Sequence, residues 1–257
     1  MRITLLGTGT SHGVPVLGCE CPTCTSTDPR DFRTRSSAYV CMGENGPGIL
    51  IDTATEFRLQ SLKNRVSRVD LVLMTHCHAD HVCGFDDLRR FNELQNQTIP
   101  VYGNHDTIVQ IARMFSYIFD PRAQVGGGKP RIDLHEVSGE FTANGVRITP
   151  IPLRHGAIPV LGYRIGGFAY ITDCSEISQA SLSLLENLDL LVLGVLRFRP
   201  HPTHLNLEAG LELIRRLKPR RCLFTHICHD FLHRELSGVL PEGIRPGYDG
   251  EQIDIER

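Results

Sequence analysis

The sequence gathers three histidines and one aspartate directly after a short apolar segment. Residues 69–74 read as a buried strand, and they lead into Thr75-His76-Cys77-His78-Ala79-Asp80-His81. Imidazole and carboxylate groups together suit a borderline divalent cation such as zinc or manganese. A single metal cannot easily use four ligands and still accept a substrate, so the cluster predicts a site with more than one metal at a strand end.

Three further candidate ligands occur downstream, and each of them closes a short apolar segment. They are His155, Asp173 and His226. With the first cluster they supply five histidines and two aspartates, which are enough donors for two metals. Two cations about 4 Å apart would polarise a bridging water to hydroxide and stabilise charge on the attacked centre and the leaving oxygen. The residues therefore predict a hydrolase.

The order His-x-His-x-Asp-His, followed by single His, Asp and His residues at strand ends, resembles the metallo-β-lactamase-fold hydrolases over nearly the whole chain. The resemblance implies an α+β fold, the four-layer αββα sandwich. It also implies a ligand set for each metal: His76, His78 and His155 for the first, Asp80, His81 and His226 for the second, and Asp173 as a bridge between them.

Cys174 competes with its neighbour Asp173 as a ligand, since the β-lactamases proper use a cysteine near this point. Successive residues on a strand point to opposite sides, so only one of the two can face the metals. We expect Asp173 to do so.

Strand-like and helix-like segments alternate along the chain, and no low-complexity linker divides them. We therefore expect a single hydrolase domain over residues 1–257. Two β-rich halves that each end in helices predict two sheets packed face to face with helices outside. Strands are expected near residues 2–6, 37–42, 48–52, 69–74, 132–136, 140–143, 146–152, 161–166, 168–172 and 189–193. Helices are expected near residues 86–94, 178–187 and 206–217.

The segment from Asn104 to Arg131 combines an amphipathic helix pattern with the run Gly126-Gly127-Gly128. Three roles are open for it: a lid, a subunit contact, or an ordinary helix followed by a surface loop. Apolar residues at helical spacing most often face a core, which favours the third.

The composition argues against two classes of protein. The 257 residues carry a formal charge of −2, whereas general nucleic-acid-binding domains usually have a marked basic excess. No apolar run reaches the length of a membrane span, and the segment Met1–Leu6 enters a strand rather than a signal peptide. We therefore expect a cytoplasmic protein without nucleic-acid or membrane partners.

Three of the nine cysteines form a compact group, Cys19, Cys21 and Cys24, in a loop that also contains Gly18. Such a group can hold one tetrahedral zinc if a fourth ligand is supplied. His229 is the best fourth ligand, and Cys228 is an alternative. Within the superfamily this group with a His-x-x-His partner resembles the PhnP-like phosphodiesterases, in which the corresponding residues hold a structural zinc. The stretches 7–15 and 247–250 also resemble that family. The resemblance further implies a homodimer.

His204 is the candidate general acid, because phosphodiesterases of this superfamily have a histidine at this place. Imidazole can give a proton to an alkoxide leaving group and can stabilise charge on phosphate. His201 competes for the role, and Asp80 is expected to be essential to catalysis as well as a ligand.

The predicted function is a metal-dependent phosphodiesterase for small phosphodiesters, cyclic ones included, with in-line attack by the bridging hydroxide. Candidate substrate contacts are Ser11, His12 and Arg154.

Three alternatives stay open. The first is a tRNA 3′-processing endonuclease, although only eighteen positions separate His155 from Asp173, which leaves little room for a substrate arm. The second is a glyoxalase II-like thioesterase, although few residues follow His226 to form a carrier-binding region. The third is a metal-stabilised binding protein without catalysis.

Overall fold

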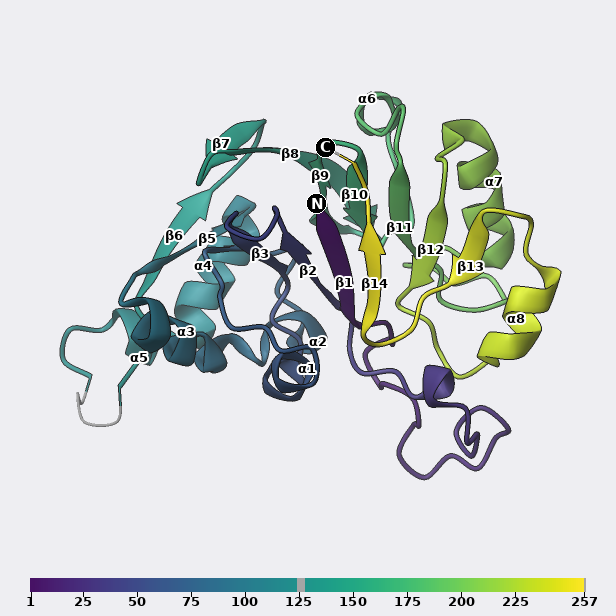
Figure 1. Cartoon of the computed structure of the whole chain (residues 1–257), viewed down its shortest axis with the longest axis horizontal. Coiled ribbons are helices and arrows are strands. Elements are labelled where there is room, and N and C mark those ends of the chain that lie inside the picture. Colours follow the sequence, from purple (N-terminus) through teal and green to yellow (C-terminus); the bar gives the residue numbers. More distant parts are fainter. Residues whose placement is uncertain (124–127, 257) are drawn as a thin grey trace.

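The computed structural model describes residues 1–123 and 128–256, and it is built from two seven-stranded sheets packed face to face (Figure 1). Helices lie on the outer face of each sheet. This confirms the α+β class and the αββα sandwich expected from the sequence. Of the glycine run discussed above, Gly126 and Gly127 lie outside the described residues.

The first sheet has the order β14-β1-β2-β3-β4-β5-β6. Its first four strands pair antiparallel and the remaining pairs are parallel. The strands are β1 (Arg2–Gly7), β2 (Ser37–Cys41), β3 (Gly48–Ile51), β4 (Leu71–Leu73), β5 (Ile99–Gly103), β6 (Ile132–Glu136) and β14 (Glu251–Asp254).

The second sheet also combines antiparallel and parallel strands, in the order β13-β12-β11-β10-β9-β8-β7. Strands β10 to β13 pair parallel, whereas β7 to β10 form an antiparallel meander. The strands are β7 (Phe141–Ala143), β8 (Val146–His155), β9 (Ile158–Ile165), β10 (Phe168–Ile171), β11 (Leu190–Gly194), β12 (Cys222–Thr225) and β13 (Ile244–Pro246).

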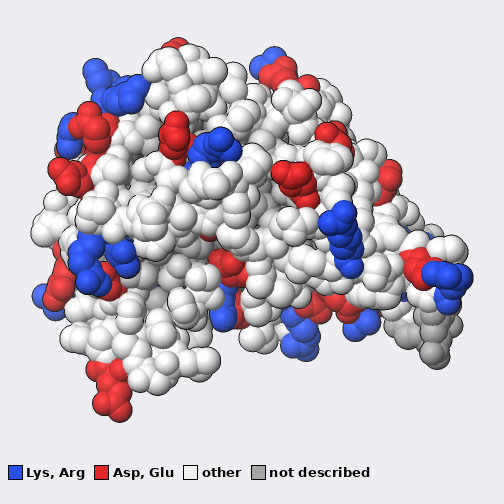
Figure 2. Space-filling view, turned by 180° about the vertical axis from the view of Figure 1, so that it is seen from behind, with Lys and Arg blue, Asp and Glu red and all other residues white. Residues whose placement is uncertain are grey.

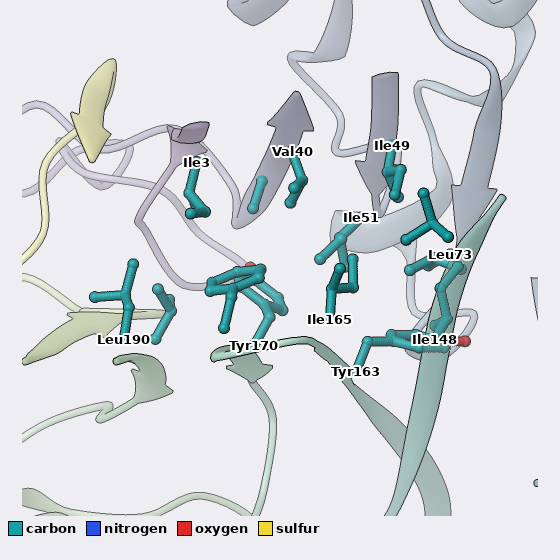
Figure 3. Close-up of a cluster of buried hydrophobic side chains, with 14 of the residues drawn as sticks. Ile3, Val40, Ile49, Ile51, Leu73, Ile148, Tyr163, Ile165, Tyr170 and Leu190 are labelled. Carbon is teal, nitrogen blue, oxygen red and sulfur yellow. The ribbon is translucent and has the colours of Figure 1, made fainter. Parts of the chain in front are cut away.

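The core between the sheets is formed by alternate residues of their strands. Ile49 and Ile51 of β3 point inward from the first sheet and meet residues such as Tyr163 and Ile165 of β9 (Figure 3). Because strand side chains alternate between faces, Leu50 points the other way, into the layer of helices. Both faces of the central strands are therefore buried, which explains their continuous apolar sequences.

The helices divide between the two outer faces (Figure 1). The first sheet is covered by α1 (Phe57–Lys63), α2 (Ala79–Val82), α3 (Leu88–Gln95), α4 (His105–Met114), α5 (Ser116–Phe119) and the 3-10 helix η2 (Phe85–Asp87). The second is covered by α6 (Gln179–Ser183), α7 (Leu207–Leu217) and α8 (His233–Val239). A further 3-10 helix, η1 (Pro29–Asp31), lies in the cysteine loop.

Several elements differ from the sequence prediction. The helix expected over 178–187 is only α6, because Leu184 ends it. The sequence analysis did not predict β5, nor did it predict α1, α8, β13 and β14. Pro100 and Gly103 weaken the strand pattern of β5, yet its neighbours β4 and β6 hold it in the sheet interior. In the described residues, no helix is long and apolar enough to cross a membrane.

Candidate metal centre

The seven predicted ligands meet where strand ends of both sheets converge. The residues from His76 to His81 follow β4 of the first sheet and lead into α2. His155 is the last residue of β8, and Asp173 and His226 follow β10 and β12 of the second sheet. Residues that are distant in sequence are thus brought to one edge of the sandwich by the strands that precede them.

The ligand atoms form two groups that share one carboxylate. In each group the ligand atoms all lie within 4.8 Å of one another. The first group is His76, His78, His155 and Asp173, and the second is Asp80, His81, Asp173 and His226. Asp173 therefore lies in the position that a bridging carboxylate requires, whereas Cys174 packs in the apolar core beside the second sheet.

The distances within the second group are short. His81 Nε2 lies 3.2 Å from Asp80 Oδ2 and 3.5 Å from Asp173 Oδ2. His226 Nδ1 lies 2.9 Å from Asp173 Oδ1. The first group adjoins it, since His76 Nε2 is 3.6 Å from Asp173 Oδ2. These atoms surround two small volumes on either side of one carboxylate.

The second ring nitrogen of most of these histidines has a partner behind the site. His81 Nδ1 donates to Asp52 Oδ2 at 2.8 Å, and His155 Nδ1 donates to the Thr203 carbonyl at 2.8 Å. His76 Nδ1 is 3.0 Å from the Thr75 hydroxyl. Such outer contacts fix the tautomer and the ring orientation of metal-binding histidines. Here they aim the opposite nitrogens of these rings into the shared volume.

Asp52 is a residue of the site that the sequence analysis missed. It follows β3 and is fully buried, and it accepts hydrogen bonds from both the backbone N–H and the hydroxyl of Thr75 at 2.8 Å. It therefore orients His81 directly and the segment that carries His76. Its position directly after an apolar strand, similar to that of Asp173 just beyond β10, was the signal that could have revealed it.

The backbone is strained at three of these positions. Asp52, Asp173 and His226 have φ values of 60°, 47° and 54°, in the left-handed region that residues other than glycine seldom adopt. Asp52 and His226 directly follow their strands, and Asp173 lies two residues after the end of β10, so the left-handed turn comes where each chain segment leaves the sheet. Such strain persists where the surrounding structure compensates for it, and it concentrates at functional sites.

The electrostatics of the site favour a bound positive charge. Burial lowers the pKa of His76 well below its usual range. Although burial acts in the opposite direction, Asp173 and Asp52 raise the pKa of His81 well above its usual value. Against the effect of burial, His226 and His81 hold the pKa of Asp173 well below its usual range. A buried carboxylate thus stays ionised and needs cationic neighbours.

A second, independent observation indicates that these residues suit divalent metals. Among the described residues, four buried ligand atoms make no hydrogen bond: His76 Nε2, Asp80 Oδ2, His81 Nε2 and His226 Nδ1. Buried polar atoms are almost always paired, so a set of four facing one volume requires an explanation. Nitrogen and carboxylate donors gathered in this way are the donor set of zinc and similar ions.

A third group of donors lies in the cysteine loop. His229 Nδ1 is 3.3 Å from the Sγ of Cys19 and 3.5 Å from those of Cys21 and Cys24. The structure thus forms a Cys3His cluster with His229 as the fourth member, while Cys228 does not belong to it.

Arg33 connects this loop to the segment that carries His226 and His229. Its buried guanidinium donates to the Cys228 and Phe231 carbonyls at 3.1 and 2.8 Å. It also pairs with Asp31 at 3.0 Å. Arg33 therefore joins the loop that carries the three cysteines to the segment that carries His229.

Most of the other predicted site residues line one cleft, which includes His204, and Arg154 lies outside it. His204 lies against the second metal group, with its ring stacked on that of His226 at 5.0 Å between centroids. His201, Ser11 and His12 line the same cleft as His204. Arg154 is not among the lining residues, and its guanidinium donates to the Ala157 carbonyl.

Comparison with known proteins identifies the family. A family model described as the beta-lactamase superfamily domain matches residues 48–227, which include all seven predicted metal ligands. The chain belongs to the beta-lactamase superfamily. Within it, the crystal structure of a new diphosphatase from the PhnP family is 39% identical to this chain. The TM-score is 0.91, and the match covers 99% of this chain and 98% of that one. The chain is thus a PhnP-like metallo-hydrolase, as the sequence predicted.

Two other matches are more limited. Zinc-bound PqqB from Methylobacterium extorquens has a TM-score of 0.80 at 17% identity, covering 99% of this chain and all of that one, so this match shows the fold. The octanoyltransferase of Porphyromonas gingivalis is 36% identical over 260 residues, which span all of this chain but 52% of that protein. The chain therefore spans about half the length of this relative.

Proposed function

We propose that this PhnP-like hydrolase cleaves small phosphodiesters, cyclic ones included. The observation that carries the proposal is the pair of His/Asp groups that share Asp173, with His204 beside them. Two bound divalent cations would supply an activated water and would stabilise the negative charge of the reacting phosphate. An in-line displacement then needs a separate group on the leaving side, and His204 is suited to this role.

The proposed ligands are those of the two groups described above, and the metals are zinc or manganese. His76, His78 and His155 would hold one ion, and Asp80, His81 and His226 the other, with Asp173 between them. A third ion, a structural zinc, would be held by Cys19, Cys21, Cys24 and His229. Against the effect of burial, the backbone N–H of Cys24 lowers the pKa of Cys21, whereas burial raises the pKa of Cys24. Zinc binds cysteine as the thiolate.

His204 is proposed to act on the leaving oxygen. Burial and the nearby His226 lower the pKa of His204 to about 3, so its imidazole is neutral before substrate binds. A neutral imidazole still donates one hydrogen bond, and a phosphate anion beside it favours the protonated form. His204 therefore gives a hydrogen bond or a proton to the departing oxygen once the substrate is in place.

The observations favour small substrates over the alternatives. Only Gly156 and Ala157 lie between β8 and β9, so no long arm for tRNA is inserted there. On the face shown in Figure 2, basic and acidic residues are interspersed and form no continuous basic track. Octanoyl transfer is not assigned to this chain, because the relative with that name is about twice as long. A homodimer and a cytoplasmic location remain expectations from the sequence.

The experiment is a substrate panel on one purified sample whose metals have been counted. We expect hydrolysis of bis(p-nitrophenyl) phosphate and of 2′,3′-cyclic nucleotides, with about three metals per chain. Activity confined to a thioester or to precursor tRNA, in a fully metal-loaded sample, would keep the fold and refute the substrate class. Absence of any hydrolysis at full metal loading would instead favour a binding protein.

A further inference from the structure

His226 differs from the other histidine ligands in the group that lies behind its ring. Its Nδ1 faces Asp173, and its Nε2 lies 3.2 Å from the hydroxyl oxygen of Thr10. Both side chains of this contact are buried. His81 and His155 contact a carboxylate and a backbone carbonyl instead. In the described part of the chain, the Nε2 of His226 therefore has one neutral side chain as its hydrogen-bond partner.

The contact with Thr10 bears on the tautomer of His226. A neutral imidazole carries a proton on one ring nitrogen and a lone pair on the other. With the proton on Nε2, the ring donates to Thr10 Oγ1, and the lone pair of Nδ1 faces the second metal group. A partner on the outer nitrogen is what fixes tautomer and ring orientation in metal-binding histidines. The Thr10 hydroxyl can thus hold the ring in the form that binds a cation.

The segment that carries Thr10 is bonded to the segment that carries His226. The Thr8 carbonyl accepts a hydrogen bond from the Ile227 N–H at 2.9 Å, and the Thr10 N–H donates to the Ile227 carbonyl at 3.3 Å. These bonds flank a parallel bridge between Gly9 and Ile227. Because His226 directly precedes Ile227, the bridge places the hydroxyl of Thr10 beside the imidazole.

Asp249 anchors the start of the Thr10 segment. One oxygen of this buried carboxylate accepts from the Thr8 N–H and hydroxyl at 2.9 and 2.8 Å. The other accepts from the Thr34 N–H and hydroxyl at 2.7 and 2.6 Å. Charge-assisted bonds of this kind are among the stronger hydrogen bonds in proteins. The stretches 247–250 and 7–15, which the sequence analysis related to one family, thus meet behind the second metal group.

We propose that Thr10 is a positioning residue, whose hydroxyl orients His226 toward the second metal group and which the Asp249 network holds in place. The inference rests on the proposed function, because it takes His226 to be a metal ligand. Thr10 also lines the cleft that contains His204, so a contact with substrate is the competing role. The two roles have different consequences: positioning changes metal affinity and kcat, whereas a substrate contact changes KM.

The test compares Thr10→Val, which keeps the shape of the side chain but removes the hydroxyl, with Thr10→Ser, which keeps the hydroxyl. Ser181→Ala is the matched control. Ser181 is also buried and its hydroxyl donates to the Pro152 carbonyl at 2.6 Å, but it belongs to neither metal group. Melting temperature verifies folding, and Thr10→Ala replaces Thr10→Val if that variant does not fold.

The first measurements need no substrate. They are the metal content, the dissociation constant of each metal in competition with a chromophoric chelator, and the absorption spectrum after loading with cobalt. We expect Thr10→Val to weaken the binding of one active-site metal by about 10- to 100-fold and to change the cobalt spectrum. With bis(p-nitrophenyl) phosphate, kcat should fall while KM stays unchanged. Thr10→Ser should restore most of the metal affinity, and Ser181→Ala should leave it unchanged.

Three results would overturn the inference. They are wild-type metal affinities and cobalt spectrum in Thr10→Val, an equal loss of affinity in Thr10→Ser and Thr10→Val, and a raised KM with normal metal affinity, which would indicate a substrate contact. Failure of the proposed function is distinguishable from these. A wild-type protein that binds both active-site metals but hydrolyses no phosphodiester would refute the proposed function, and the metal affinities of the variants would still test the position of Thr10.

Discussion

At the scale of single residues, the site depends on side chains that orient the ligands as well as on the ligands themselves. The proposed ligands could be picked out in the sequence because they are metal-binding residue types that follow apolar segments. Asp52 has the same placement, but a lone aspartate after a strand has no neighbouring ligand to mark it.

Asp52→Asn should lower metal affinity and turnover by about 10- to 100-fold, because an amide cannot hold the His81 ring as a carboxylate does. The measurement is activity against added metal concentration, followed by kcat at saturation. Asp70→Asn is the control, since Asp70 is also buried and accepts a backbone hydrogen bond at 2.8 Å, from Gly48, away from the site. Equal effects of the two variants would show that Asp52 acts only on folding.

His204→Ala should cost more with a poor leaving group than with a good one. An alkoxide needs a proton or a hydrogen bond as it leaves, whereas p-nitrophenolate does not. We expect kcat to fall by about 100-fold or more for a 2′,3′-cyclic nucleotide and by clearly less for bis(p-nitrophenyl) phosphate. The same loss on both substrates would refute the role of leaving-group donor.

At the scale of elements, the turn between β8 and β9 connects two parts of the site. His155 ends β8 and its Nδ1 donates to the Thr203 carbonyl, next to His204. Gly156 follows with a φ of 60°, and a Cβ added there would lie 2.9 Å from Thr203 Cγ2. Any side chain at 156 therefore pushes against the loop that carries the proposed proton donor.

Gly156→Ala should lower both activity and stability, while Gly145→Ala should lower stability alone. Gly145, in the turn between β7 and β8, has a φ of 75° and open space around its Cα. Both variants place a side chain in the left-handed region, which costs about 1–2 kcal/mol of unfolding free energy. Only Gly156→Ala also displaces Thr203. Thermal unfolding and kcat separate the two effects, and unchanged kcat in Gly156→Ala would contradict this account of the turn.

At the scale of the whole molecule, the sandwich could be predicted because periodicity and the order of elements were clear. The existence and the first and last residues of individual helices and strands were less predictable. Strand β5 contains Pro100 and is held between β4 and β6, whereas α6 ends at Leu184 within an otherwise suitable helical sequence. The cleft depends on three separate segments, and only the folded chain brings them together.

The Cys3His cluster should stabilise the molecule without taking part in the reaction. Cys21→Ser should remove about one zinc per chain and lower the melting temperature, because a structural zinc contributes directly to folding. Cys83→Ser is the control, since Cys83 is exposed and lies outside the cluster. Metal analysis and thermal unfolding are the measurements. A full zinc complement in Cys21→Ser would refute the assignment.

The central claim is that catalysis requires metal on both sides of Asp173. The most direct measurement is metal content and single-turnover hydrolysis of bis(p-nitrophenyl) phosphate for the wild type and for Asp80→Ala, in folded samples reloaded with zinc or manganese. Asp80 belongs only to the second group, so we expect the variant to lose about one metal and at least about 1,000-fold in rate. An unchanged rate in a folded, metal-verified Asp80→Ala protein would contradict the account.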